Sequence, residues 1–163
     1  MKHRHLKDEE LKIIKTQLNN YIDISLFDFD KLYIMEDEKI EVIYATKEVI
    51  ENANKFTNIH FIGISFGSFE LKQTGKYKFT MSLEGMSIIG NNISKNYIVI
   101  NDKSETLFLY GRDIFKSSII EMNGAGRVAV LNEQRELLGI GNYGGGDIIK
   151  NIVDKGWYLR KGG

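Results

Sequence analysis

Short strand-like runs separated by tight turns fill the C-terminal part of the sequence, and they limit its possible folds more than any other feature. Each run is rich in Val, Ile, Leu or aromatic residues and is bounded by Gly, Asn, Asp or Ser, the usual pattern of strands joined by turns. The runs cover residues 96–101, 105–111, 118–122, 127–132 and 136–143. Strands spaced so closely in under 70 residues favour a small barrel. Residues 111–118 are predicted to add one short helical turn between two strands.

The N-terminal half mixes helical and strand-like patterns. Apolar residues recur there first at helical spacing and later in strand-like runs. The predicted elements are a helix over 6–22, strands over 31–35 and 39–46, a helix over 46–56 capped by Thr46, and a buried strand over 59–71. Residues 76–89 fit a strand or a helix equally well.

A cluster of turn-forming residues, 90–96, separates these two patterns. We therefore predict an N-terminal α/β domain over 1–94 and a small β-barrel domain over 95–163. The predicted fold class is α+β.

Charge is balanced over the whole chain, with 22 basic and 22 acidic residues. Residues 1–94 hold 12 basic and 14 acidic side chains, and residues 95–163 hold 10 and 8. Nucleic-acid binding would therefore need a local basic patch, for which the C-terminal half is the better place. The chain has no cysteine and three histidines, two of them at the N-terminus. We expect no metal site.

The stretch GIGNYGGGD matches the glycine spacing of a dinucleotide-binding loop at Gly139, Gly141 and Gly144. Such a loop needs a following helix, a second strand and an acidic residue about 20 positions further on. Only 19 residues follow Gly144, so we expect no cofactor. The alternative is a hairpin with its turn at 132–135. Gly139 and Gly141 then share one face of its second strand, where backbone can pack closely or bend, and 144–146 form a loop.

Three segments resemble the PUA domain, an RNA-binding module. They are VAVLNEQRELLGIGNY, LFLYGRDIFKSSI and VDKGWYLRKG, the last resembling the C-terminal strand and tail of the module. In PUA domains the RNA groove is generally lined by the short helix and the last strand. The resemblance therefore implies that GRDIFK and IIKNIVDKGWYLRK lie near RNA.

The N-terminal half narrows this resemblance. FIGISFGSFE, then KYKFTMSLEGM, then FLYGRDIFKSSI resemble the ribosome-biogenesis factor family called Nip-seven, in a short archaeal-type form. Membership would imply an N-terminal α/β domain and a C-terminal PUA-type barrel. It would also imply a role in large-subunit assembly and pre-ribosomal RNA processing, RNA binding through the PUA domain, and contact with the exosome or other assembly proteins.

Basic residues within these segments are the candidate phosphate contacts. Arg112 and Lys116 are four apart, so a helical turn would present both on one face. The densest basic cluster flanks the final predicted strand, and Asp147 and Asp154 weaken its field. That cluster consists of Lys150, Lys155, Arg160 and Lys161.

Aromatic residues offer a second kind of RNA contact. Tyr143, beside the glycine loop, is a candidate for stacking on a base, although packing at the barrel rim is the alternative for its ring. Trp157 and Tyr158 are expected to close the bottom of the barrel rather than to contact RNA.

No catalytic motif occurs, and the Asp28–Asp30 pair is typical of solvated acids. The absence of such motifs predicts a non-enzymatic protein, and the resemblance implies that it binds RNA. A protein-interaction scaffold with little RNA affinity is the alternative, and a nucleotide-dependent enzyme is a third. The apolar runs are too short for a membrane span, and residues 1–15 hold no apolar signal segment. The expected location is the cytoplasm.

Overall fold

The computed structural model of the chain describes residues 2–53, 55–56 and 59–161. Its contacts divide the chain into two compact units. The N-terminal unit consists of the residues before Asn20 together with Asp23–Met86. The C-terminal unit consists of Asn20–Ile22 together with the chain from Ser87 onward. The predicted domain boundary between residues 94 and 95 stays a prediction.

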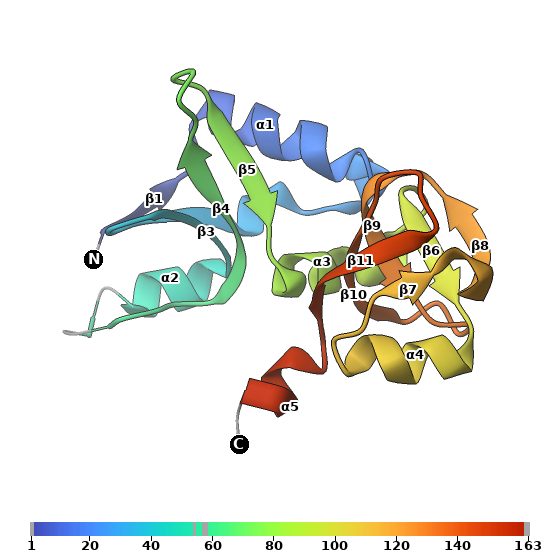
Figure 1. The fold of residues 1–163 in the computed structure, drawn as a ribbon. Helices are drawn as coiled ribbons and strands as arrows, with labels where there is room; N and C mark the ends of the chain where they lie inside the picture. Colours follow the sequence, from blue (N-terminus) through green and yellow to red (C-terminus); the bar gives the residue numbers. More distant parts are fainter. Residues whose placement is uncertain (1, 54, 57–58, 162–163) are drawn as a thin grey trace. The chain divides into compact units, whose positions relative to one another are not determined.

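The N-terminal unit is built on a five-stranded antiparallel sheet in which every strand pairs with the next one in sequence (Figure 1). Two short 3-10 turns, η1 (Ile24–Leu26) and η2 (Phe29–Lys31), precede its second strand. The strands in order are β1 (Lys2–His5), β2 (Leu32–Glu36), β3 (Ile40–Tyr44), β4 (Ile64–Leu71) and β5 (Tyr77–Met81).

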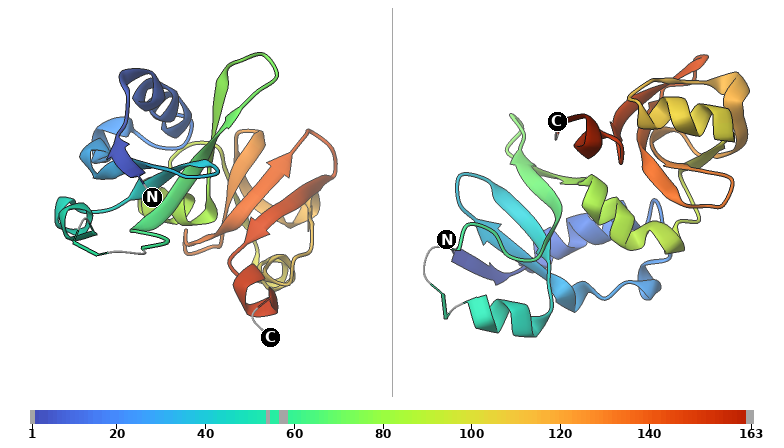
Figure 2. Two further views of the ribbon diagram at one scale, coloured as in Figure 1. Left: turned by 90° about the vertical axis from the view of Figure 1, so that its left-hand side faces the viewer. Right: turned by 90° about the horizontal axis from the view of Figure 1, so that it is seen from below.

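Two helices cover opposite faces of this sheet (Figures 1 and 2). Helix α1 (Asp8–Leu18) buries Ile14 and Leu18. Helix α2 (Lys47–Ala53) buries Ile50 against alternate residues of β2 and β3. Because both faces are covered, four consecutive residues of β2 are buried.

The helices and strands predicted for this unit up to β4 are present, but the helix predicted over 6–22 ends at Leu18 and the strand predicted over 59–71 begins at Ile64. Strand β1 was not predicted. Thr46 accepts a hydrogen bond from the Val49 amide at 3.4 Å and so caps α2 as expected. The predicted extension of that helix to residue 56 crosses residue 54, which lies outside the described residues. The undecided segment 76–89 contains both structures, β5 followed by helix α3 (Leu83–Ile89).

The C-terminal unit is a six-stranded sheet that curls around its own core (Figure 1). The strand order is β7-β11-β10-β9-β6-β8, and only the pairing of β6 with β9 is parallel among the described strands. Turn η3 (Gly90–Asn92) precedes this sheet. The strands are β6 (Tyr97–Ile100), β7 (Ile114–Phe115), β8 (Ile119–Asn123), β9 (Gly126–Leu131), β10 (Leu137–Tyr143) and β11 (Ile148–Asp154).

The glycines of β10 leave no room for a side chain: backbone approaches Gly139 closely, as predicted, and a core side chain packs against Gly141. A Cβ on Gly139 would lie 2.3 Å from the Val153 carbonyl oxygen, and one on Gly141 would lie 2.9 Å from a methyl group of Ile149. The pairing register of β10 shifts near both glycines. The chain after the glycine loop forms β11, antiparallel to β10, where a dinucleotide site would need a helix.

Four predictions for the C-terminal unit are wrong. Residues 105–111 do not form a strand, because α4 (Asp102–Leu109) is a helix that leaves Leu107 exposed. Of residues 111–118, only η4 (Lys116–Ser118) is helical. The end of the chain forms helix α5 (Trp157–Lys161) rather than a strand, and Trp157 and Tyr158 are exposed instead of closing the barrel. Gly162 of the predicted tail lies outside the described residues.

Candidate nucleic-acid interface

An open groove of about 780 Å³ runs beside α4 in the C-terminal unit. Its walls come from α4, the loop that follows this helix, β7 and the start of β11. The lining residues are Asn101, Lys103, Ser104, Leu107, Gly111, Arg112, Asp113, Ile114, Phe115, Ser118 and Ile148. The groove is lined by the cations Lys103 and Arg112, by one acid, Asp113, and by apolar side chains. Cations bind phosphates and exposed rings stack on bases.

Local capping signals explain why α4 is a helix. Asn101 accepts a hydrogen bond from the Ser104 amide at 2.9 Å, which is an N-cap, and Asp102 and Glu105 lie in the first turn. The helix ends at Leu109, and Gly111, the residue after the C-cap Tyr110, has a φ of +84°, the left-handed conformation that commonly follows a helix. The alternation of apolar residues that predicted a strand was outweighed by these signals at both ends.

The cap at Gly111 also places Arg112. The Arg112 amide donates to the Leu107 carbonyl at 3.1 Å, and the Gly111 amide donates to the Phe108 carbonyl at 2.8 Å, which together form a Schellman motif. The exposed Arg112 side chain lines the groove.

Lys116 does not share a helical face with Arg112, because β7 separates them. Both side chains are nevertheless exposed. The Lys116 ammonium lies 5.9 Å from the centre of the Tyr143 ring. Arg112 therefore remains at the groove, while Lys116 contacts an aromatic ring beside β11.

Asp113 and Lys150 form an exposed ion pair at the groove. The Lys150 ammonium lies 2.9 Å from one Asp113 oxygen, and the Asn151 amide donates to the other at 2.9 Å. These contacts, the Asn151 amide first, lower the pKa of the Asp113 carboxyl below its usual value. The Lys150 side chain is still 65 % exposed, so a phosphate can compete for its ammonium.

Arg160 is instead bound by a buried carboxylate. Its guanidinium binds both oxygens of Asp154 at 2.9 Å and also donates to the Leu109 carbonyl. The Asp154 side chain is only 2 % exposed, and it also accepts a hydrogen bond from the Asn151 side chain at 3.1 Å. This arrangement fastens α5 to the end of α4, so we remove Arg160 from the candidate RNA contacts.

The remaining basic candidates at the end of the chain are exposed. The Lys155 amide donates to the Leu138 carbonyl at 2.8 Å, and its side chain is exposed. The Lys161 ammonium lies 5.6 Å from the centre of the Trp157 ring. A cation held over an exposed aromatic ring can contact a phosphate while the ring contacts a base.

Tyr143 is buried rather than available for base stacking. Only 7 % of its surface is exposed, and its ring packs in the core with Ile98, Val128 and Ile149. The packing alternative for this residue is therefore the one that the structure supports. Phe115, which the sequence analysis missed, is 63 % exposed and lines the groove.

Lys103 is a second missed residue of the groove. It lies in the first turn of α4, and its role depends on α4 being a helix. The capping signals around Asn101 and Gly111 could have revealed that helix. The short strand β7, in which Ile114 is buried and Phe115 is exposed, has no comparable signal in the sequence.

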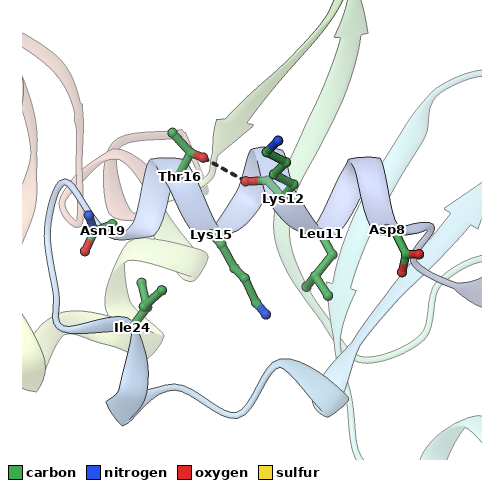
Figure 3. A pocket seen from close by; sticks show the side chains of 7 residues that line it. All are labelled: Asp8, Leu11, Lys12, Lys15, Thr16, Asn19 and Ile24. Carbon is green, nitrogen blue, oxygen red and sulfur yellow. Dashed lines mark hydrogen bonds between the residues drawn. The ribbon is translucent and has the colours of Figure 1, made fainter.

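A smaller groove of about 460 Å³ lies along α1 in the N-terminal unit (Figure 3). None of the predicted site residues lines it. Lys15 points into this groove, but its ammonium lies 5.1 Å from the centre of the Phe29 ring. Asp8 also lines the groove and opposes an anion there. The groove beside α4 is larger, contains the predicted site residue Arg112 and exposes the Phe115 ring, so it is the stronger candidate.

Within residues 2–53, 55–56 and 59–161, no group of three or more His, Cys, Asp or Glu side chains could hold a metal ion. No helix in those residues is long and apolar enough to cross a membrane.

Comparisons with known families match both units. Residues 3–83 match the family model described as the NIP7/UPF0113 pre-PUA domain, and residues 96–163 match the UPF0113 PUA domain. A UPF0113 protein of Archaeoglobus fulgidus is 32 % identical over 174 aligned positions, which cover 98 % of this chain and 95 % of that protein. A UPF0113 protein of Aeropyrum pernix is 40 % identical over 68 residues, 40 % of this chain and 39 % of that protein.

Solved structures agree on the fold. A conserved PUA domain protein from Thermoplasma acidophilum aligns with a TM-score of 0.58 at 16 % identity, over 97 % of each chain. A PUA domain structure from Aeropyrum pernix aligns with a TM-score of 0.52 at 14 % identity, over 97 % of this chain and 88 % of the other. The predicted α+β fold with a C-terminal PUA-type barrel is confirmed.

Proposed function

We propose a function for this chain from its family, because it belongs to the NIP7/UPF0113 family and carries a PUA domain, which suggests RNA binding. The proposed function is that of a non-enzymatic RNA-binding factor in large ribosomal subunit biogenesis and pre-ribosomal RNA processing. The proposed RNA is pre-ribosomal or other single-stranded RNA, and the exosome or other assembly proteins are proposed partners. The proposed location is the cytoplasm.

The groove beside α4 is the observation that carries this proposal. Arg112 and Lys103 bring two cations to an apolar surface that includes the exposed Phe115 ring. Guanidinium and ammonium groups bind phosphates, and an exposed ring stacks on an unpaired base. Single-stranded RNA offers both groups at once.

Four other cations of the C-terminal unit extend this surface in the proposal. They hold the RNA backbone without reading its sequence. The four are Lys116, Lys150, Lys155 and Lys161.

Charge reversal tests the proposal. The variant Lys150→Glu/Lys155→Glu should bind a fluorescent 20-nucleotide single-stranded RNA at least about tenfold more weakly than the wild type at 0.1 M salt, because about two phosphate contacts are lost and two acids gained. The variant Lys47→Glu/Lys55→Glu, with the same charge change in the N-terminal unit, is the control. Equal binding by both variants would rule out this site.

A protein-interaction scaffold with little RNA affinity is the second candidate. The observation that favours it is α5, which exposes Trp157, Tyr158 and Leu159 in succession. Exposed apolar side chains in a row are typical of protein contact surfaces. An electrophoretic shift assay separates the two functions, because a scaffold would show no RNA affinity even at low salt.

A further inference from the structure

The hairpin formed by β4 and β5 projects beyond the other strands of the N-terminal sheet (Figures 1 and 2). Its loop is closed by two hydrogen bonds, from the Lys72 amide to the Lys76 carbonyl and from the Gly75 amide to the Lys72 carbonyl, both 2.9 Å long. Gly75 has a φ of +77°, which a three-residue hairpin loop requires at its last position. Residues 70–78, here called the hairpin tip, are all exposed.

Aromatic packing makes the support of this hairpin tip rigid. The Phe69 ring lies 5.3 Å from the Phe79 ring and 6.2 Å from the Tyr77 ring, measured between ring centres. Phe69 and Phe79 are buried and form a cross-strand pair. Side chains on the hairpin tip are therefore held on an ordered base, which reduces the entropy lost when a ligand binds.

Three lysines and one glutamate give the hairpin tip a local positive charge in a chain whose net charge is zero. The pairing of Glu70 with Lys78, and the bond between Lys72 and Lys76, place these four side chains on one face. None of the three ammonium groups forms an ion pair or side-chain hydrogen bond with another residue that the structure describes.

The lysine arrangement concentrates positive charge at the end of the hairpin. Lys72 and Lys76 lie opposite each other across the hairpin, and like charges in that position repel. A phosphate group between them would remove this repulsion. The arrangement is thus suited to a polyanion more than to solvent alone.

The other face of the hairpin tip is apolar. Leu71 and Tyr77 form its last cross-strand pair, and 47 % of the Tyr77 surface is exposed. With unpaired lysines on one face and an exposed aromatic ring on the other, a single strand that passes over the end of the hairpin can contact the lysines through its phosphates and stack a base on Tyr77.

We infer that the hairpin tip is a second RNA-contact surface, in which Lys72, Lys76 and Lys78 bind backbone phosphates and Tyr77 stacks on an unpaired base. The inference rests on the proposed function, because it assigns part of the same RNA to the N-terminal unit. It adds a contact outside the PUA domain.

Neutralisation of the three lysines in the full-length chain tests the inference. The variant Lys72→Gln/Lys76→Gln/Lys78→Gln should bind a fluorescent 20-nucleotide single-stranded RNA about tenfold or more weakly at 0.1 M salt. The slope of log K against log salt should fall by about 2, because each phosphate contact on a single strand contributes about 0.7.

The matched control is Lys39→Gln/Lys47→Gln/Lys55→Gln, which removes the same charge from exposed positions of the same unit. Both variants should unfold at the wild-type temperature, since every substituted side chain is exposed. If the two variants bind RNA equally, the inference is overturned while the proposed function stands. If the wild type itself binds no RNA, both fail.

The aromatic contact has its own test. Tyr77→Ala should weaken binding of single-stranded RNA about fivefold or more and leave binding of a duplex of equal length unchanged, because duplex bases are already stacked. Equal loss on both RNAs would contradict stacking. If the triple-lysine variant binds RNA normally but no longer binds polyglutamate, the surface recognises an acidic protein and the inference is wrong.

Discussion

Two carboxylate–cation pairs lie on either side of Asn151, and they differ in burial rather than in chemistry. Lys150 approaches Asp113 at 2.9 Å, and Arg160 approaches Asp154 at the same distance. The Asp154 side chain is almost fully buried, whereas Lys150 is largely exposed. The first pair can exchange its partner for a phosphate, and the second holds α5 against α4.

The difference shows that basic residues close together in the sequence need not act together. Lys155, Arg160 and Lys161 form one cluster in the sequence, yet Arg160 alone among them is bound by a buried carboxylate. The aromatic residues show the same contrast, because Phe115 is exposed at the groove while Tyr143 is buried. Burial therefore decides which of the candidate basic and aromatic residues can contact a ligand.

The largest expected effect is a loss of stability when the pair formed by Asp154 and Arg160 is broken. Asp154→Ala should lower the free energy of unfolding by about 2–3 kcal/mol, because the Asn151 side-chain amide and the Arg160 guanidinium lose a buried acceptor. Asp113→Ala should lower it by less than about 1 kcal/mol. Urea denaturation of both variants measures the difference, and equal losses would contradict the assigned roles.

The different exposure of Phe115 and Tyr143 predicts different effects of their substitution on RNA binding. Phe115→Ala should weaken single-stranded RNA binding about tenfold, because one stacked base is lost, and should leave stability nearly unchanged. Tyr143→Phe keeps the buried ring and should leave RNA affinity unchanged. Fluorescence anisotropy measures both affinities. A larger effect of Tyr143→Phe would return that residue to the RNA surface.

A smaller change, this time a gain in RNA affinity, is expected when the exposed Asp113–Lys150 pair is broken. Asp113→Asn releases Lys150 and removes a negative charge from the groove, so RNA affinity should rise about threefold at low salt. The rise should disappear at high salt, where charges are screened. Glu133→Gln, the same charge change at an exposed position in the β9–β10 turn, is the control and should have a smaller effect.

The smallest effect is a dependence of stability on pH. The pKa of Asp113 is lowered in the folded protein from its ordinary 3.8, so the carboxylate stabilises the fold above that value and the contribution is lost as the pH falls through the lowered pKa. The stability difference between wild type and Asp113→Asn, below about 1 kcal/mol at pH 7, should vanish in acid. Urea denaturation from pH 7 to about pH 2 tests this. A difference that grows in acid would contradict the assignment.

Much of the fold is local and could be predicted. The hairpin of β9 and β10 follows from its turn, and α2 follows from Thr46 as its cap. The helix α4 could also have been predicted, because Asn101 and Gly111 mark its two ends. The two-residue strand β7 could not, because its pairing with β11 joins residues more than 30 positions apart.

The candidate site was predictable only in part. Arg112 and Lys150 were found from charge and resemblance, and both are exposed at or beside the groove. Lys103 and Phe115 were missed because their positions depend on α4 and β7. Tyr143 and Arg160 were included because neither their burial nor their partners can be inferred from neighbouring residues in the sequence.

Composition, spacing and capping residues thus establish the α+β class and most of the order of the elements. The sequence also contains none of the catalytic motifs considered above. These properties depend on residues within one turn or one hairpin of each other. Tertiary packing decides which cations remain free, because a carboxylate such as Asp154 becomes a strong partner only after the fold has removed it from water. It also assembles the groove beside α4 from four separate segments, which no single stretch of the sequence contains.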